Sequence, residues 1–228
     1  MMAEQAVGNA EIGGTADARR EQMLRAALAV ISERGYPDTR IADVADRAGI
    51  SPALVIYYFK TRDRLLTEAI RYAEDGWYAD SQRRMEALPT AAERLEELVA
   101  MSCLPEDDVE PHSSWLLWLD FWAQAARNPE VASVRQNSDE RWREVISTQV
   151  VAGQEAGEFC DVYPADFAIA LSALLDGLAI QIALQDPVVD PVGAFELCMH
   201  FVADRLGFQW TPGRGRRGVT KEAHQKGG

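Results

Sequence analysis

The sequence has few of the features that mark a secreted or membrane protein. Its three cysteines, Cys103, Cys160 and Cys198, are odd in number and widely spaced, so no disulfide framework is implied and reduced thiols fit best. No segment approaches the ~18 uninterrupted apolar residues that a membrane span needs. Residues 1–16 lack the basic start and apolar centre of a secretion signal. We therefore expect a cytoplasmic protein with no membrane partner.

Motifs of catalysis and metal binding are also missing. There is no GxSxG nucleophile elbow, no HExxH zinc motif, no phosphate-binding glycine loop and no dinucleotide fingerprint. His112, His200 and His224 lie far apart, and we expect each to be a surface or core residue. The acidic stretch 105–111 is bracketed by prolines without a His or Cys cluster nearby, which predicts a solvated loop. We expect no catalytic residue, metal or cofactor, and an enzyme has no residue support.

The pattern of apolar residues is helical. Neither period-2 alternation nor an internal repeat of roughly 20–50 residues is found. We predict an all-α protein of about nine helices, which cover 17–34, 41–48, 52–59, 62–88, 91–103, 114–128, 129–156, 165–185 and 191–206. The predicted divisions are a disordered N-terminal tail at 1–16, a three-helix module at 17–64, a larger helical domain at 65–208, and a basic flexible tail at 209–228.

Residues 39–66 carry the strongest local signal in the chain. Apolar residues recur at helical spacing up to Ala48, and Gly49 follows where a left-handed residue would end that helix. Ser51 is then a predicted N-cap, and Pro52 a first-turn residue of a second short helix. Two helices joined by a short turn that contains glycine are typical of a helix-turn-helix, although an ordinary helical hairpin has the same outline.

The second short helix ends in a cluster of aromatic and basic side chains. Tyrosine hydroxyls and Lys or Arg at a helix end suit the phosphate backbone of DNA. The front of this helix is apolar and would read thymine methyl groups and DNA shape more than guanine. The predicted base-edge contacts are Pro52, Ala53 and Leu54, with Ser51 beside them and Arg40 as a further candidate. The predicted phosphate contacts are Tyr57, Tyr58, Lys60 and Arg62.

The net charge of −13 is unevenly distributed. Residues 17–64 hold nine basic against seven acidic side chains, whereas residues 65–208 hold nine basic against 26 acidic side chains. DNA would repel an acidic body, so contact should be confined to the N-terminal module. The excess of arginine over lysine, 20 against three, suggests a GC-rich bacterial genome.

The run GYPDTRIADVADRAGISPALVIYYFKTRDRLL resembles the DNA-binding region of the TetR family of bacterial regulators. The resemblance has no gaps over more than thirty residues and includes D-V-A at 43–45, A-G-I-S at 48–51 and Tyr58. Ile56 stands where the family usually has a tyrosine, and Leu54 where a small polar residue is usual. These departures bear on the operator sequence and leave the class unchanged.

The two C-terminal helices are apolar over more than one face. The pattern alone is also that of a plain core, but the TetR resemblance implies dimerisation through these helices as a four-helix interface. Two-fold symmetry would then place two recognition helices about one DNA turn apart, ~34–36 Å, on a palindromic operator. The predicted interface residues are Leu171, Leu174, Leu175, Leu178, Ile182, Phe195, Met199 and Val202.

Four tryptophans lie on two consecutive predicted helices, and two aspartates are expected near them. A hydrophobic core explains such a pattern, and so does a ligand pocket whose aromatic faces and carboxylates suit a cation. Residues 115–206 resemble the C-terminal domain of the BetI-like branch of the family, whose best-known member responds to choline, which implies a cationic effector. The predicted ligand contacts are Trp115, Trp118, Asp120, Trp122, Trp142 and Asp176.

Together these patterns predict a homodimeric transcriptional repressor, with a helix-turn-helix DNA-binding domain at 17–64 and a ligand-binding and dimerisation domain at 65–208. The dimer would bind a double-stranded palindromic operator, and a small-molecule effector would release it. The switch is expected to be mechanical, because ligand in the body would tilt the long helix that starts at Arg62 and spoil the spacing of the two recognition helices. The alternative from another class is an all-α small-molecule-binding dimer without DNA-binding function.

Overall fold

The computed structural model describes residues 2–104 and 111–212, and the side chains of residues 16–104 and 115–212. The described part contains nine helices, and all its other residues lie in turns and loops, which confirms the all-α prediction. The predicted loop at 105–110 and the predicted flexible tail from residue 213 lie outside the described residues. The helices are α1 (Met2–Arg34), α2 (Ile41–Ala48), α3 (Pro52–Phe59), α4 (Arg62–Glu86), α5 (Ala91–Cys103), α6 (Pro111–Ala125), α7 (Pro129–Glu155), α8 (Pro164–Ala183) and α9 (Pro191–Leu206).

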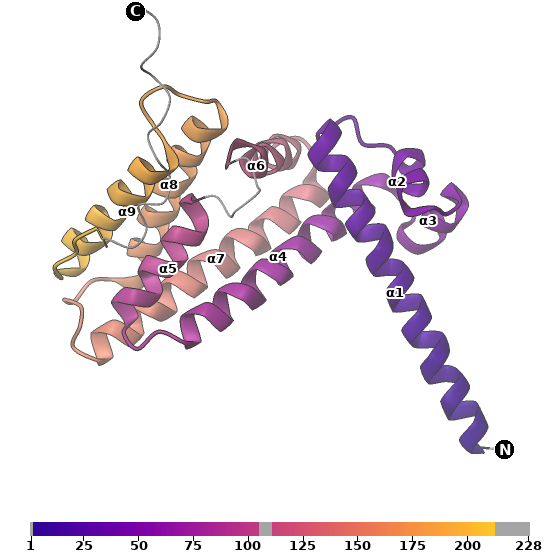
Figure 1. Ribbon diagram of the computed structural model, residues 1–228, viewed down its shortest axis with the longest axis horizontal. Helices are drawn as coiled ribbons and strands as arrows, with labels where there is room; N and C mark the ends of the chain where they lie inside the picture. Colours follow the sequence, from indigo (N-terminus) through magenta and orange to yellow (C-terminus); the bar gives the residue numbers. More distant parts are fainter. Residues whose placement is uncertain (1, 105–110, 213–228) are drawn as a thin grey trace, which may run out of the picture.

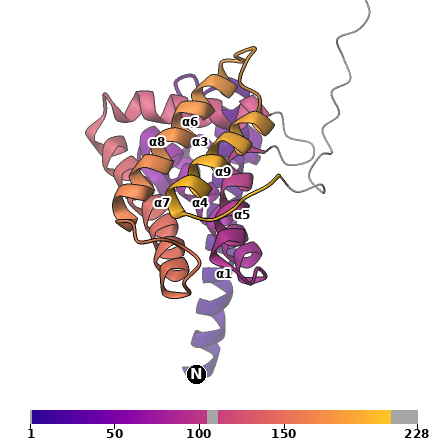
Figure 2. The same ribbon diagram turned by 90° about the vertical axis from the view of Figure 1, so that its left-hand side faces the viewer.

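The molecule consists of a small N-terminal head and a larger helical body (Figure 1). α1, α2 and α3 form the head, and α4 leads from the head along the body. α5, α7, α8 and α9 make up most of the body, while α6 contacts both α1 in the head and α7 and α8 in the body. Figure 2 shows α8 and α9 side by side at the end of the body that faces away from the head.

α1 is longer than the sequence predicts. It begins at Met2, whereas residues 1–16 were expected to be disordered. Residues 3–6 are Ala, Glu and Gln, which are good helix formers, and a helix that is already nucleated extends without a second nucleation cost. The packing that fixes α1 lies in its second half, where Met23 and Ile31 are buried in the head.

The helix-turn-helix forms as the sequence predicts. Gly49 has a φ of 67°, in the left-handed region, and ends α2. Ser51 Oγ accepts a hydrogen bond from the backbone N–H of Leu54 at 3.3 Å and caps α3. Val55 and Phe59 are buried and hold α3 against the head, which leaves the opposite side of this eight-residue helix exposed.

The molecule has two hydrophobic cores, and the core of the head extends past the domain boundary predicted at residue 64. The head core includes Leu65, Leu66 and Ile70 from α4 and Phe121 from α6. The body core is built from α5, α7, α8, α9 and the end of α4. The first turns of α4 and part of α6 therefore belong structurally to the head, so these two helices connect the head with the body.

α8 is apolar along its whole length. By length and composition alone it would pass as a membrane-spanning helix, with a mean hydropathy of 1.6, and no other helix in the described part of the chain does so. In the structure 39% of this stretch is buried, against α6, α7 and α9 among others. A core helix of a globular protein passes the same test, so packing accounts for one side of α8. Its other side is exposed and carries Ile169, Ala173 and Gly177 together with Asp166 and Asp176.

Candidate DNA-binding surface and ligand pocket

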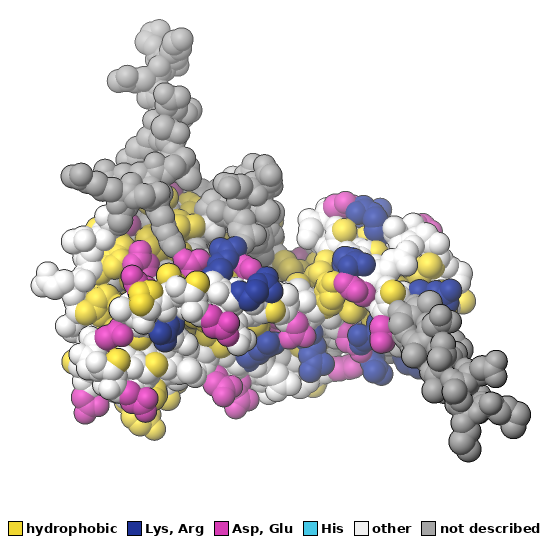
Figure 3. Space-filling model, turned by 60° about the horizontal axis from the view of Figure 1, so that its bottom comes forward, with side chains coloured by type: hydrophobic (Ala, Val, Ile, Leu, Met, Phe, Trp, Pro, Cys, Tyr) yellow, Lys and Arg dark blue, Asp and Glu magenta, His cyan; other side chains and the backbone are white. Residues whose placement is uncertain are grey.

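The exposed side of α3 carries most of the predicted DNA contacts. Of these residues, Arg40, Ser51, Pro52, Ala53, Tyr57 and Lys60 are exposed, and Leu54 and Tyr58 are half-buried. The Lys60 ammonium lies 5.1 Å from the centre of the Tyr57 ring and donates a hydrogen bond to the Tyr57 carbonyl at 2.8 Å. A hydroxyl and a positive charge thus stand together at the end of α3, as a phosphate contact requires. On the face drawn in Figure 3, basic and acidic side chains are interspersed.

Arg62 was predicted to contact phosphate, but the structure engages it inside the head. Its Nε donates a hydrogen bond to the Thr39 carbonyl at 2.6 Å, and one terminal nitrogen donates to the carbonyls of Tyr36 and Pro37. The other terminal nitrogen pairs with Asp63 at 2.8 Å. The guanidinium also lies 5.1 Å from the centre of the Tyr36 ring. Arg62 therefore fastens the turn between α1 and α2 to the start of α4, which corrects its predicted role.

Arg62→Ala should lower the free energy of unfolding by about 1–3 kcal/mol, because the carbonyls of the turn lose their charged donor. Chemical denaturation followed by circular dichroism measures this loss. The salt dependence of DNA binding should keep its slope, since no phosphate contact is removed. Arg64→Ala is the control, because its exposed ion pair with Glu68 should contribute less than about 1 kcal/mol. Unchanged stability with a salt slope lowered by roughly one would instead support the phosphate contact.

Asp120 joins the body to the head. Its Oδ2 accepts a hydrogen bond from the backbone N–H of Tyr36 at 2.9 Å. Gly35 in the same turn has a φ of 80°, and a Cβ there would lie 2.8 Å from Asp120 Oδ2, so glycine is required under this carboxylate. At a second point, Asn128 Nδ2 at the start of α7 donates to Asp63 Oδ2 at 2.9 Å. Polar contacts from α6 and α7 therefore hold the head in place.

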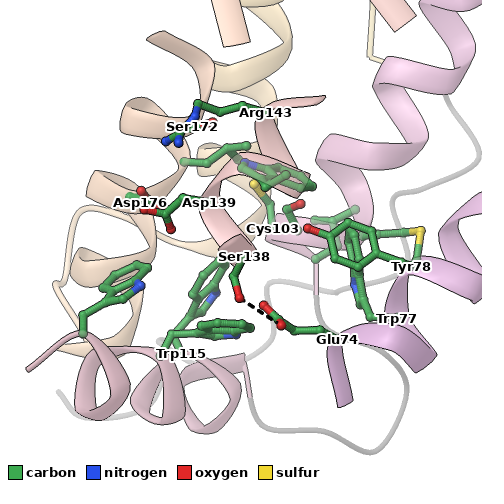
Figure 4. A pocket seen from close by; sticks show the side chains of 17 residues that line it. Glu74, Trp77, Tyr78, Cys103, Trp115, Ser138, Asp139, Arg143, Ser172 and Asp176 are labelled. Atoms are coloured by element: carbon green, nitrogen blue, oxygen red, sulfur yellow. Dashed lines mark hydrogen bonds between the residues drawn. The ribbon is translucent and has the colours of Figure 1, made fainter. Parts of the chain in front are cut away.

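A cavity of about 360 Å³ lies in the body between α4, α5, α6, α7 and α8 (Figure 4). This volume is within the range of small-molecule sites. All four predicted tryptophans and Asp176 are among the residues that line it. The lining consists of Glu74, Trp77, Tyr78, Met101, Ser102, Cys103, Leu104, Trp115, Trp118, Trp122, Ser138, Asp139, Trp142, Arg143, Ser172, Leu175 and Asp176.

One face of α6 lines the cavity, and another face contacts the head. Trp115, Trp118 and Trp122 are three or four residues apart, so they share the face that lines the cavity. Asp120 is two positions beyond Trp118, which is roughly 200° further round the helix, and it therefore reaches the head. Phe121 is fully buried in the head core. The structure thus removes Asp120 from the predicted ligand contacts.

α4 contributes a wall of the cavity that the sequence reasoning missed. Glu74, Trp77 and Tyr78 all line the cavity, and the centres of the Trp77 and Trp142 rings are 5.6 Å apart. Positions i, i+3 and i+4 lie on one face of a helix, so the spacing of these three residues was a usable signal. α4 was predicted only as a link between the two domains, whereas it is also part of the pocket.

Three carboxylates line the cavity, and burial raises the pKa of each. Glu74 accepts a hydrogen bond from Ser138 Oγ at 3.0 Å, which lowers its pKa less than burial raises it. Asp139 pairs with Arg135 at 2.7 Å. Partial burial raises the pKa of Asp176 to about 6, and the neighbouring Asp139 carboxylate adds to the shift. A positive charge in the cavity would stabilise the ionised form of these groups.

Most of the predicted dimer contacts belong to the core of one subunit. Leu171, Leu175, Ile182, Phe195, Met199 and Val202 are buried in the body core, and Leu174 and Leu178 are half-buried. The outer face of α8 and α9 carries other apolar side chains, including Ile169 at 55% and Leu197 at 51% exposure. Ala173 and Gly177 are also exposed on α8. The bulkiest sides of α8 and α9 face inward because they pack on α5, α6 and α7, so the predicted set requires this correction.

Two families match the chain in its two halves. Residues 23–69 match the family described as bacterial regulatory proteins of the tetR family, and residues 91–207 match the C-terminal domain of the BetI-type transcriptional repressor. The chain is 30% identical over 195 residues to the HTH-type transcriptional regulator BetI of Burkholderia cenocepacia, a match that covers 83% of this chain and 94% of the relative. The BetI regulator of Burkholderia mallei is 30% identical over 199 residues, which cover 85% and 96% of the two chains.

Solved structures agree with these matches. A putative transcriptional regulator from Saccharomonospora viridis in complex with choline has a TM-score of 0.73 and 27% identity, covering 82% of this chain and 96% of that one. A putative TetR-family regulator from Rhodococcus sp. has a TM-score of 0.73 and 26% identity, covering 82% and 98%. The chain is accordingly a DNA-binding transcriptional regulator and not an enzyme. It belongs to the TetR family of bacterial regulators, with a C-terminal domain of the BetI type.

Proposed function

We propose that the protein is a homodimeric cytoplasmic repressor that a small organic cation releases from a palindromic operator. The observation that carries this proposal is the cavity, which combines aromatic rings from α4, α6 and α7 with the half-buried carboxylate of Glu74 and the more exposed carboxylate of Asp176. Tryptophan faces attract cations, and a carboxylate away from water gains most from a positive partner. In the part of the chain that the structure describes, no group of three or more His, Cys, Asp or Glu side chains is placed to hold a metal ion, so an organic cation is the matching class.

The relatives support a cationic ligand. The regulator from Saccharomonospora viridis was solved in complex with choline, which is a quaternary ammonium ion. This chain shares the BetI-type C-terminal domain over residues 91–207. A quaternary ammonium group has no N–H to donate, so it depends on aromatic faces and charge attraction, and the cavity supplies both.

Dimerisation would use the outer face of α8 and α9. The two helices lie side by side at the end of the body in Figure 2. Exposed apolar side chains on both helices, among them Ile169 and Leu197, are of the kind that marks an interaction surface. Ala173 and Gly177 would let the helices of a second copy approach closely. A two-fold dimer formed here would present one α3 helix to each half of a palindrome.

The connection from the cavity to the DNA would run through α4 and α6. α4 begins in the head core with Leu65 and reaches the cavity at Glu74 and Trp77. α6 lines the cavity with Trp118 and holds the head through Asp120. A ligand that prefers one arrangement of these helices shifts the population of head positions, and with it the spacing of the two α3 helices.

A gel-shift assay on the DNA directly upstream of the chain's own gene tests this proposal. We expect a dimer-sized complex on a palindromic sequence that weakens as salt is raised and dissociates when choline is added. If neutral or anionic metabolites dissociate the complex, and choline and other organic cations do not, the proposal of a cationic effector is wrong. A complex that no small molecule affects would overturn ligand-controlled release.

A further inference from the structure

Two carboxylates in the cavity stand apart from each other and from any cation partner. Glu74 projects from α4 beside Ser138, whereas Asp176 projects from α8 beside Asp139, as Figure 4 shows. Neither Glu74 nor Asp176 forms an ion pair within residues 16–104 and 115–212. Partial burial raises the pKa of both carboxyl groups, although Asp176 keeps an exposed surface whereas Glu74 is half-buried.

Two basic side chains near the cavity already form ion pairs, and a third has only a small effect on the pKa of the lining aspartates. Arg141 pairs with Asp75 at 2.5 Å, and Arg135 pairs with Asp139 at 2.7 Å. Arg143 is the one basic side chain among the described residues that line the cavity. It lowers the pKa of the nearby aspartates less than burial raises it. Three carboxylates and one guanidinium line the cavity, and Arg135 from outside the lining pairs with one of the carboxylates, Asp139, so Glu74 and Asp176 remain against Arg143.

A ligand with one positive charge would satisfy one of the two unpaired carboxylates. It would also cover the second carboxylate, and a carboxylate that is removed from water without a partner is costly. A linear ligand with a positive nitrogen at each end would pair with both. A volume of about 360 Å³ gives room for such a chain between the walls.

The surroundings of the two carboxylates differ. Figure 4 places Glu74 near the rings of Trp115, Trp77 and Tyr78, which suit a methylated ammonium group. Asp176 shares its side of the cavity with Asp139, whose carboxylate pairs with Arg135, and the unpaired Asp176 carboxylate suits an ammonium group with N–H donors.

We propose that the effector is a linear organic dication, with a methylated ammonium group at the Glu74 end and an N–H-bearing ammonium group at the Asp176 end. This inference rests on the proposed function and specifies the chemical class of its effector.

Isothermal titration calorimetry with two matched series of ligands tests the inference. The dications are ω-aminoalkyl trimethylammonium ions of increasing chain length, and each is compared with the ω-hydroxyalkyl trimethylammonium ion of the same length, of which choline is the shortest familiar member. We expect the dication to bind at least about tenfold more tightly than its hydroxyl counterpart at the best length. Affinity in the dication series should pass through a maximum, because only one span reaches both carboxylates. Equal affinities at every length would overturn the inference.

Two substitutions assign the ends of the ligand. Asp176→Asn should remove most of the roughly tenfold difference in affinity between the dication and its hydroxyl counterpart. The affinity of the hydroxyl series should not change. Glu74→Gln should weaken both series by a similar factor, because both carry the trimethylammonium end. Glu74→Gln removes a half-buried charge and Asp176→Asn removes an exposed, unpaired one, so both variants should keep their thermal stability. Asp166→Asn, on an exposed position of the same helix α8, is the control and should change neither series.

The outcomes separate this inference from the proposed function. If the hydroxyl series binds and releases the protein from the operator, and the dications bind no more tightly than their hydroxyl counterparts, the effector is a cation but not a dication. If Asp176→Asn leaves the advantage of the dications intact, the assignment of the Asp176 end is wrong. If no cation of either series binds and a neutral or anionic ligand does, both proposals fall.

Discussion

Leu197→Arg is expected to yield a monomer that binds the operator about 100-fold more weakly than the unchanged protein. Linking two DNA-binding heads in a dimer raises the affinity for a two-part operator by roughly this factor. Leu197 is 51% exposed on α9, and Ile169 is 55% exposed on the neighbouring helix α8. In a symmetric interface the substitution would bury two guanidinium groups without partners. The monomer would keep one head, and therefore the contacts of one half-site only.

Light scattering coupled to gel filtration measures the mass, and a gel-shift titration measures the affinity. Leu116→Arg is the matched control, because Leu116 is 46% exposed but lies on α6, away from the outer face of α8 and α9. This control should stay dimeric and bind DNA normally. A dimeric Leu197→Arg protein with full operator affinity would show that dimerisation uses another surface.

Asp120→Ala is expected to weaken the coupling between effector and operator while leaving the cavity intact. The substitution deletes the carboxylate that accepts the backbone N–H of Tyr36 in the turn between α1 and α2. Tyr36 is fully buried, so we expect the free energy of unfolding to fall by about 1.5–3 kcal/mol, the contribution of a charge-assisted hydrogen bond. The cavity face of α6 is unchanged, so effector affinity in the absence of DNA should change little.

The ratio of operator affinities without and with effector measures the coupling. Coupling free energies of 1–3 kcal/mol are typical, and we expect Asp120→Ala to reduce the ratio by about tenfold. Asp120→Asn keeps an oxygen acceptor at the same place and should retain more of both the stability and the coupling. Full coupling in Asp120→Ala would mean that α4 alone transmits the effect of the ligand.

The DNA-binding head shows how far local sequence chemistry reaches. Gly49, Ser51 and Pro52 set the turn and the start of α3 through interactions with residues at most four positions away. Such short-range preferences are visible in the sequence itself. The limit appears at Arg62, whose hydrogen-bond partners Tyr36, Pro37 and Thr39 lie 23 to 26 positions earlier. No local rule tells whether an arginine will meet a phosphate or a backbone carbonyl.

The pocket was predicted in part because helical spacing reveals which residues share a face. Trp115, Trp118 and Trp122 follow this spacing, and all three line the cavity. The same rule would have excluded Asp120, which stands on the opposite side of α6 from Trp118. Spacing also puts Glu74, Trp77 and Tyr78 on one face of α4, but it cannot show which helices surround a cavity. Only the packing brings Glu74 within hydrogen-bond reach of Ser138 of α7.

In the sequence alone, helical spacing and short-range caps and turns predict an all-helical chain and the position of the helix-turn-helix, and the ungapped resemblance over residues 35–66 indicates the family. The tertiary structure decided which apolar side of α8 and α9 is core and which is free to pair, since both sides are apolar and only packing on α5, α6 and α7 distinguishes them. It also decided that Arg62 and Asp120 hold the head to the rest of the molecule, because their partners are distant in sequence and meet only after the helices have packed.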